Sequence, residues 1–357
     1  MAQITQLPLH GGRAPRWLFG RMVRLGGAIS RAVIDEYGPD ELLGRLCDSG
    51  WFQALSCAIG YDWHSSGTTT VTLGALKEAL NADGSIFIAG GKGKAGVNTP
   101  NDIVAGVDRL SIPGKAEAFT ELSRLSAKID SSMVYDDIGI YHHTFLFTGS
   151  GRWGVVQQGM SPASSMAVRF QWISDRIDHN DISNEPHSGV DSSRRITSID
   201  LTSSANSWVK PASLEALQDM GSAERIMNYP KRHGISPGAD LTEKGIKMLK
   251  KASDANPSSY RELLLTKGIG RSTIRSLAII SSLIYDRELA RRDPVSYAYN
   301  LGGKDGVPYS INRRTYDSVI REMEGIVDCA NLPREDKYRA LKSLNSSLSG
   351  CVGSRGQ

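Results

Sequence analysis

Apolar residues recur at the 3.6-residue spacing of amphipathic helices through much of the first 131 residues. This spacing predicts helices at 15–35, 39–59, 69–81 and 115–131. Apolar or alternating runs predict strands at 85–89, 138–147 and 153–160. The last two strands flank Thr148-Gly-Ser-Gly-Arg152, a segment that indicates a β-hairpin with a five-residue loop.

The pattern changes after a polar region at about 174–208, which is rich in turn-forming residues and predicts a loop or domain junction. Beyond it the strand signals nearly vanish and helices are predicted at 211–228, 241–253, 258–266, 272–286, 313–328 and 334–347. We therefore expect the α+β class. A mixed α/β domain at 1–205 would be followed by an all-α domain at 206–350, and a chain of 357 residues suits two domains.

The composition favours a folded globular protein, because 40% of the residues are hydrophobic and 22% are charged. A net charge of +4 is compatible with nucleic acid without proving it. The four cysteines are scattered and form no C-x-x-C pair, which favours a reducing cytoplasm. No signal-peptide pattern and no apolar run of about 18 residues is present, so we expect a cytoplasmic location and no membrane contact.

Residues 263–278 have the pattern of a helix-hairpin-helix module. Two glycines, Gly268 and Gly270, allow a tight turn, and the second helix opens with its backbone N–H groups and its dipole available to an anion. The expected anion is a DNA phosphate, and a plain glycine turn between packed helices is the alternative. Lys267, Arg271, Ser272 and Arg275 are expected to face solvent. The candidate DNA-binding residues are Lys267, Gly268, Ile269, Gly270, Arg271, Ser272, Thr273 and Arg275.

The same segment resembles the base-excision glycosylases built on this hairpin. In those enzymes an aspartate soon after the second helix, and in some members a lysine just after the hairpin glycines, perform base removal. Here Ser272 occupies the lysine-like position and Asn312 is the best match to the aspartate. The resemblance therefore implies the scaffold without its chemistry, and a glycosylase or lyase is the third hypothesis.

Two polar blocks in the first domain are candidates for anion binding. Asp62-Trp-His64-Ser-Ser lies just before a helix start near Thr69, where N–H groups and hydroxyls can hold an anion or simply cap the helix. Gly90-Gly-Lys92-Gly-Lys94 follows a strand and predicts a phosphate cradle. The spacing is not that of a Walker loop, so ATP or GTP is not expected as a cofactor. A redox cofactor is not expected either.

Two histidines and two glutamines lie in the predicted strand pair. Alternation places His142 and His143 on opposite faces, and likewise Gln157 and Gln158, so that one histidine and one glutamine can share a face. A histidine near the lysines can act as general base or nucleophile in phosphodiester cleavage. With Asp62, Asp136 or Asp137 it can instead hold Mg²⁺ or Mn²⁺. A structural role is the alternative for each histidine.

Several blocks resemble one family over nearly the whole chain. They are Leu7–Phe19, Trp51–Leu55, Asp62–Gly67, Ala89–Ala95, Tyr141–Phe145, Trp153–Met160 and Gly302–Gly306. Together they resemble the prokaryotic family catalogued as domain of unknown function 763. Leu301 and the segment Ser310–Arg313 depart from the family pattern, which directs attention to the N-terminal blocks.

The leading hypothesis is a structure-selective, metal-dependent deoxyribonuclease of DNA repair or recombination. The hairpin domain would hold duplex or branched DNA, and the first domain would hydrolyse the phosphodiester with Mg²⁺ or Mn²⁺. Its candidate catalytic residues are Asp62, His64, Lys92, Lys94, His142, His143, Gln157 and Gln158. A non-enzymatic DNA-binding protein that forms a homo-oligomer or docks a partner is the second hypothesis.

Overall fold

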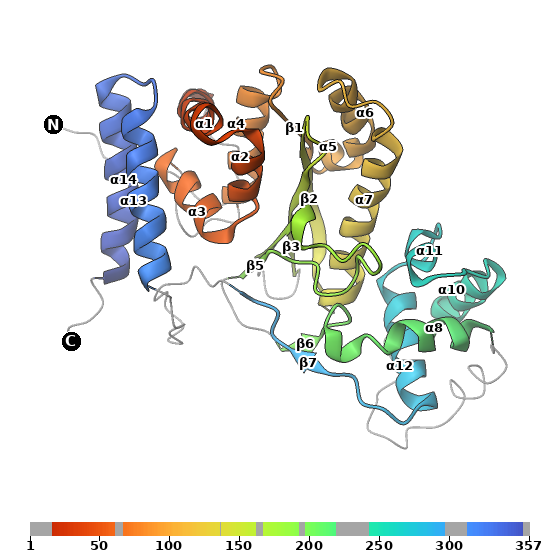
Figure 1. Ribbon diagram of the computed structural model, residues 1–357. Helices are drawn as coiled ribbons and strands as arrows, with labels where there is room; N and C mark the ends of the chain where they lie inside the picture. Colours follow the sequence, from red (N-terminus) through yellow and green to blue (C-terminus); the bar gives the residue numbers. More distant parts are fainter. Residues whose placement is uncertain are drawn as a thin grey trace.

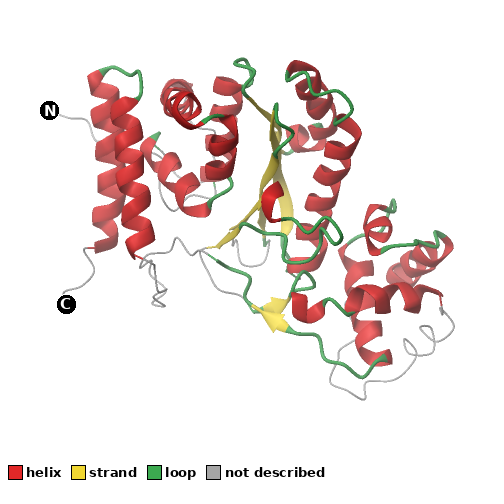
Figure 2. Cartoon of the chain, viewed as in Figure 1, coloured by secondary structure: helices red, strands yellow, loops and turns green. Residues whose placement is uncertain are grey.

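The computed structural model describes residues 16–60, 67–135, 137–161, 167–192, 197–218, 243–296 and 313–352. These residues form helices and a central antiparallel sheet, which confirms the predicted α+β class (Figures 1 and 2). The helices are α1 (Arg16–Tyr37), α2 (Pro39–Leu46), α3 (Ser49–Ala58), α4 (Thr68–Leu80), α5 (Lys94–Val97), α6 (Thr99–Arg109), α7 (Ala116–Ile129), α8 (Val209–Gln218), α10 (Glu243–Asp254), α11 (Tyr260–Leu265), α12 (Arg271–Ile284), α13 (Arg313–Cys329) and α14 (Arg334–Val352). Short turns of other helix types are the π-helix η1 (Asp130–Val134), and the 3₁₀ turns η2 (Ser174–Arg176) and η3 (Ser204–Asn206).

The central sheet has five strands in sequential order, each antiparallel to the next. They are β1 (Ile86–Lys92), β2 (Gly139–Thr148), β3 (Trp153–Met160), β4 (Ala167–Ile173) and β5 (Gly189–Ser192). Pairing of Phe147 with Trp153 closes the predicted hairpin between β2 and β3. A separate two-stranded ladder joins β6 (Ser198–Ile199) to β7 (Arg291–Arg292).

Helices cover both faces of this sheet, as Figure 1 shows. The helices α1 to α4 pack on the face that carries Ile88, Leu146 and Val156. The helices α6 and α7 pack on the opposite face, against Phe145 and Phe147. Because side chains alternate along a strand, neighbouring residues of β2 enter different environments.

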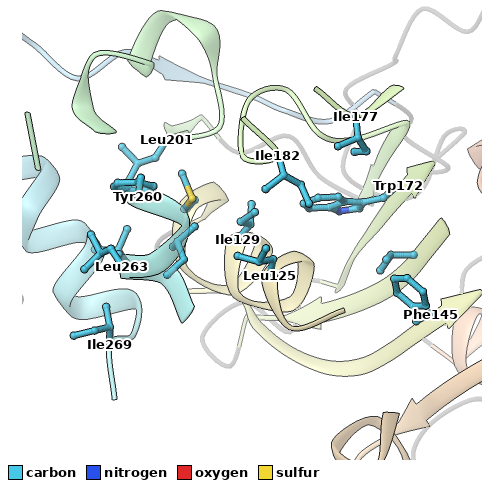
Figure 3. Packing of buried hydrophobic residues seen from close by; sticks show 14 of the residues in the cluster. Leu125, Ile129, Phe145, Trp172, Ile177, Ile182, Leu201, Tyr260, Leu263 and Ile269 are labelled. Atoms are coloured by element: carbon cyan, nitrogen blue, oxygen red, sulfur yellow. The ribbon is translucent and has the colours of Figure 1, made fainter. Parts of the chain in front are cut away.

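The apolar core on the α7 face continues into the helices that follow the sheet. Figure 3 shows Leu125 and Ile129 of α7 close to Leu263 of α11 and to Ile269 of the hairpin. The bundle of α8, α10, α11 and α12 is thus joined to the sheet by one continuous apolar cluster.

The last two helices, α13 and α14, pack elsewhere, beside α1 and α3 (Figure 1). Met323 and Val327 enter the core on the α1–α4 face, and Arg24 of α1 forms an ion pair of 2.5 Å with Asp336 of α14. The helices expected in one domain at 206–350 therefore lie at two ends of the described structure. Helical periodicity shows that a face is apolar, but it does not show which apolar face it meets.

Most predicted elements appear within a few residues of their expected bounds. Of the helix expected at 211–228, the structure describes α8 as far as Gln218, and 219–228 lies outside the described residues. The helix expected at 39–59 is two helices, because Asp48 caps α3 by accepting a hydrogen bond of 2.8 Å from the Trp51 N–H. Sequence reasoning missed α5, α6, β4 and β7, and β5 and β6 lie within the region expected to be a loop. Within the described residues, no helix is long and apolar enough to span a membrane.

Candidate functional site

A row of polar side chains crosses one face of the sheet. The register pairs Lys92 with His142, His142 with Gln158, Gln158 with Arg169, and Arg169 with Asp191. We call these five residues the Lys92 row. The first four share the α1–α4 face, because they lie two or four residues from the apolar positions that pack there, and Asp191 joins them through its pairing with Arg169.

His142 is the anomaly of the Lys92 row. Its side chain is 1% exposed, and neither ring nitrogen has a hydrogen-bond partner within the described part of the chain. Burial lowers the pKa of His142 to about 3, and His143, Lys92 and Lys77 act in the same direction. The imidazole is therefore neutral, with one unpaired donor and one unpaired acceptor. Buried polar groups in native proteins are nearly always hydrogen-bonded, so this exception requires an explanation.

The Lys92 end of the row is open to solvent. Lys92 is exposed, and its Nζ lies 5.7 Å from the centre of the Tyr141 ring. Tyr141 is the extra residue of a β-bulge between Ile140 and His142, and its hydroxyl accepts a hydrogen bond from the Gln158 amide. Bulges of this kind redirect side chains and are frequent beside functional sites.

The other end of the row is closed by a buried ion pair. Arg169 and Asp191 lie 2.7 Å apart and are almost fully buried. The Arg169 guanidinium also stacks 4.5 Å from the centre of the Phe52 ring and donates to Gln53. Burial raises the pKa of the Asp191 carboxyl in spite of the opposing charge of Arg169.

Gly90 and Gly91 continue strand β1, and Gly93 follows the strand directly before α5. Gly90 has a φ of +89°, and a Cβ there would lie 2.4 Å from the His143 carbonyl oxygen. Asp102 accepts hydrogen bonds from the Gly90 N–H (2.9 Å) and from Lys77 Nζ (2.6 Å). Burial opposes ionisation of Asp102, but these bonds still lower its pKa. Close packing therefore accounts for Gly90 without a phosphate.

A second polar cluster lies on the opposite face, around the other histidine. His143 Nδ1 donates to Gln157 Oε1 at 2.7 Å, and His143 Nε2 accepts from Ser123 Oγ at 2.8 Å. We assign these roles because the Gln157 amide donates to Asp130 and, at 3.0 Å, to the Ser126 carbonyl. Burial lowers the pKa of His143, although Gln157 and Asp130 oppose the shift.

Asp130 is the centre of this cluster. It lies at the start of η1 with no exposed surface, and it accepts from Gln157, from Trp172 Nε1 (2.9 Å) and from His187 Nε2 (2.6 Å). We call Ser123, His143, Gln157, Asp130, Trp172 and His187 the Asp130 network. Each polar group described above has a partner, as expected of a structural cluster. Sequence reasoning missed Asp130, because only the fold places it beside Gln157.

The predicted catalytic residues are thus divided. The structure brings Lys92, His142 and Gln158 together, and it places His143 and Gln157 on the other face. Lys94 begins the four-residue helix α5 and lies outside the row. Asp62, His64, Asp136 and Asn312 lie outside the described residues, and Asp137 accepts a hydrogen bond from Ser161. No group of three metal-ligating side chains occurs in the described ranges.

The predicted hairpin connects α11 to α12. Ser259 caps α11 by accepting from the Glu262 N–H, Gly268 has a φ of +92°, and Ile269 is buried. At Gly270 the chain enters α12 without a side-chain cap. A Cβ on Gly268 would lie 2.9 Å from Lys251 Nζ, so an ammonium group from α10 stands beside the turn. Lys267 and Ser272 are exposed, as expected.

Two arginines expected at the surface of the hairpin point inward instead. Arg275 is only 4% exposed and donates to the Ile199 carbonyl at 2.8 Å. Arg271 is half-buried and donates to the carbonyls of Ser131 (2.8 Å) and Ile138. Thr273 is buried as well. The expectation of solvent-facing arginines was wrong, because this face of α12 packs on η1.

Lysines that sequence reasoning missed contact the hairpin from other elements. Lys128 of α7 donates to the Ile269 carbonyl, and Lys251 of α10 approaches Gly268. The only sequence signal for Lys251 is the series Lys247, Lys250 and Lys251 on one predicted helix. No local pattern connects Lys128 with a turn that follows it by more than a hundred residues.

Comparison with known proteins gives one match. Residues 3–311 match the family model described as Protein of unknown function (DUF763). No curated protein and no solved structure matches the chain. The match includes the Lys92 row, the Asp130 network and the hairpin, and it ends before α13 and α14.

Proposed function

The chain belongs to the DUF763 family, and we propose from its geometry that it is a DNA-binding protein that grips the phosphate backbone at 266–270. The observation that carries this proposal is the Lys251 ammonium group beside Gly268, at the uncapped start of α12. The backbone N–H groups at a helix start and the positive end of the helix dipole favour an anion. Lys251 and the exposed Lys267 add charge at the same place.

Two half-buried basic side chains, those of Arg271 and Lys128, fix the position of the hairpin in this proposal. Arg271 donates to the backbone of Ser131 in η1 and of Ile138 before β2, and Lys128 of α7 donates to the Ile269 carbonyl, so these bonds tie the turn to three other segments. A preorganised turn loses less conformational entropy when it binds a phosphate. Contacts of this kind are made to phosphates and not to base edges, so binding is independent of sequence.

Anisotropy of a labelled duplex, titrated at several salt concentrations, tests the proposal. Lys251→Gln should weaken binding on every sequence alike and reduce the slope of log K against log salt by about 1. Lys342→Gln removes the same charge from an exposed position on α14, and it should leave the DNA affinity and the salt slope unchanged. Equal affinity and slope in the two variants would contradict the proposal.

Phosphodiester hydrolysis at the Lys92 row is the second candidate function, and the unpaired His142 ring favours it. Lys92 would bind a non-bridging oxygen, and the neutral imidazole would accept the proton of an attacking water. A nearby phosphate anion would raise the low pKa of His142 and make it a better base. We propose Mg²⁺ or Mn²⁺ as the metal to test.

Labelled duplex, flap and junction DNA, incubated with Mg²⁺, Mn²⁺ or EDTA, tests hydrolysis directly. Scission should be abolished by His142→Gln and strongly reduced by Lys92→Gln. Lys115→Gln, an exposed change at the other end of the sheet, is the matched control. Binding without scission under every condition would reject hydrolysis and keep DNA binding, whereas abasic products alone would favour a glycosylase.

A further inference from the structure

The two edges of the five-stranded sheet are closed in different ways. The strand order makes β1 and β5 the edge strands. The chain that follows β7 covers the β5 edge, because the Ser296 N–H donates to the Val190 carbonyl at 2.9 Å and the Val190 N–H donates to Ser296 Oγ at 3.1 Å. Within the described residues, no strand pairs with the outer side of β1. An unpaired edge is a template for pairing with another chain, so the protection of β1 needs an explanation.

Strand β1 has the composition of a strand that associates readily. Residues 86–91, Ile-Phe-Ile-Ala-Gly-Gly, contain no charged side chain and no proline. Short uncharged segments with β-branched and aromatic residues pair with copies of themselves when they are exposed. Along an antiparallel edge strand, the N–H and C=O of every second residue point away from the sheet. Ile88 and Gly90 are two such residues, since both backbone groups of each bond side chains outside the sheet.

The side chain of Asn81 takes the place of a peptide group beside Ile88. Its Nδ2 donates to the Ile88 carbonyl at 3.0 Å, and its Oδ1 accepts from the Ile88 N–H at 2.9 Å. A carboxamide has the donor and the acceptor of a peptide bond, so it satisfies both outward groups of Ile88 as a neighbouring strand would. Asn81 is the C-cap residue of α4, so this contact comes from the end of that helix.

An ion pair closes the same edge two residues further along, at Gly90. Lys77 Nζ donates to the Gly90 carbonyl at 2.8 Å, Asp102 Oδ2 accepts from the Gly90 N–H at 2.9 Å, and the two side chains lie 2.6 Å apart. Lys77 belongs to α4 and Asp102 to α6, which lie on opposite sides of β1 (Figure 1). The Lys77 and Asp102 side chains are 31% and 22% exposed, so solvent reaches the space beside the strand. We call these two residues and Asn81 the edge guard.

We propose that the edge guard prevents β1 from pairing with β1 of a second copy of this chain. A second copy is the partner that fits, because two identical strands pair around a twofold axis. An antiparallel pair centred on Ala89 places Ile88 opposite Gly90 of the second copy, where directly opposed residues exchange both of their bonds. The four backbone groups that the edge guard holds are the groups that would form this pair. The device does not depend on DNA binding, so it goes beyond the proposed function.

Sedimentation equilibrium over a range of protein concentrations tests the edge guard. The double variant Asn81→Ala/Asp102→Ala frees three of the four outward groups, and it should self-associate at least about tenfold more tightly than the wild-type chain. Asn101→Ala/Asp108→Ala, a pair of exposed changes on α6, is the matched control and should associate as the wild type does. A folded double variant that associates no more tightly than the control would overturn the proposal.

Amide hydrogen exchange locates the association and separates it from misfolding. In the wild-type chain the N–H groups of Ile88 and Gly90 should be protected at every concentration, because their acceptors lie in the same chain. In the double variant these amides should exchange faster in dilute solution and regain protection as the copies associate, while the amides of the central strand β3 stay protected throughout. Asn81→Ala alone gives the same test at Ile88 if the double variant does not fold. Continued protection in dilute solution would show that another group closes the edge, and association without renewed protection would show that it uses another surface. Either result would overturn the proposal.

Discussion

His142 and His143 are neighbours in one strand and differ in almost every physical respect except burial. Both ring nitrogens of His143 are hydrogen-bonded inside the Asp130 network, while those of His142 have no partner in the described chain. Both rings are held neutral by burial. A satisfied buried polar group contributes to the fold, whereas an unsatisfied one costs free energy and is retained where function requires it.

The sharpest difference between the two faces should appear at Asp130. Asp130→Ala leaves the donors of Gln157, Trp172 and His187 without an acceptor in the core. We expect the free energy of unfolding to fall by about 3–5 kcal/mol, because three buried donors lose the same acceptor at once. Urea denaturation measures it, and the exposed Asp108→Ala is the control. A loss below about 1 kcal/mol would show that the network does not support the fold.

Replacing each histidine by leucine should change the free energy of unfolding in opposite directions on the two faces of the sheet. His143→Leu leaves Ser123 Oγ and Gln157 Oε1 without their hydrogen-bond partner in the core. It should therefore destabilise the protein by about 2–3 kcal/mol. His142→Leu removes two unpaired polar atoms from the core, and should be neutral or stabilising by about 1 kcal/mol. Thermal or urea unfolding of the two variants measures the contrast. Equal destabilisation would mean that His142 has a partner that supports the folded state.

The sequence alone predicts which of the two histidines and two glutamines can share a face, because alternation along a strand is a local property. The sequence pattern correctly expected one histidine and one glutamine on each face. It could not tell which face was satisfied, since the partners of His143 come from α7 and η1. Pairing across the fold, and not periodicity, decides between a structural and a functional histidine.

The same limit applies to the hairpin and to the C-terminal helices. A local pattern of apolar residues and glycines predicted α11, the turn and α12. It could not predict that Arg271 and Arg275 face η1 and β6, or that α13 packs beside α3. Each of these contacts joins segments more than seventy residues apart, where no short-range spacing carries information.

The dependence of stability on pH should reflect the unpaired ring. The pKa of His142 is about 3 in the folded protein and about 6.5 in the unfolded chain, so the unfolded chain binds more protons between these values. The contribution of His142 to the free energy of unfolding should be fully present above pH 6.5. It should be lost as the pH falls toward 3, by at most about 1.4 kcal/mol per pH unit. Urea titrations at several pH values measure the slope. His142→Leu should reduce it, and an unchanged slope would contradict the lowered pKa.

The smallest effect we expect is on stability at the open end of the row. Lys92→Gln removes an exposed charge that has no hydrogen bond within the described ranges, so the free energy of unfolding should change by less than about 0.5 kcal/mol. The same change removes one of the cations that oppose protonation of His142, so the pKa of His142 should rise. NMR titration of the imidazole measures that rise, with Lys115→Gln as the control. A stable fold with an altered His142 pKa would show that Lys92 acts on the ring and not on the fold. A large loss of stability would instead place Lys92 among the structural residues, and the open end of the row would lose its distinction from the Asp130 network.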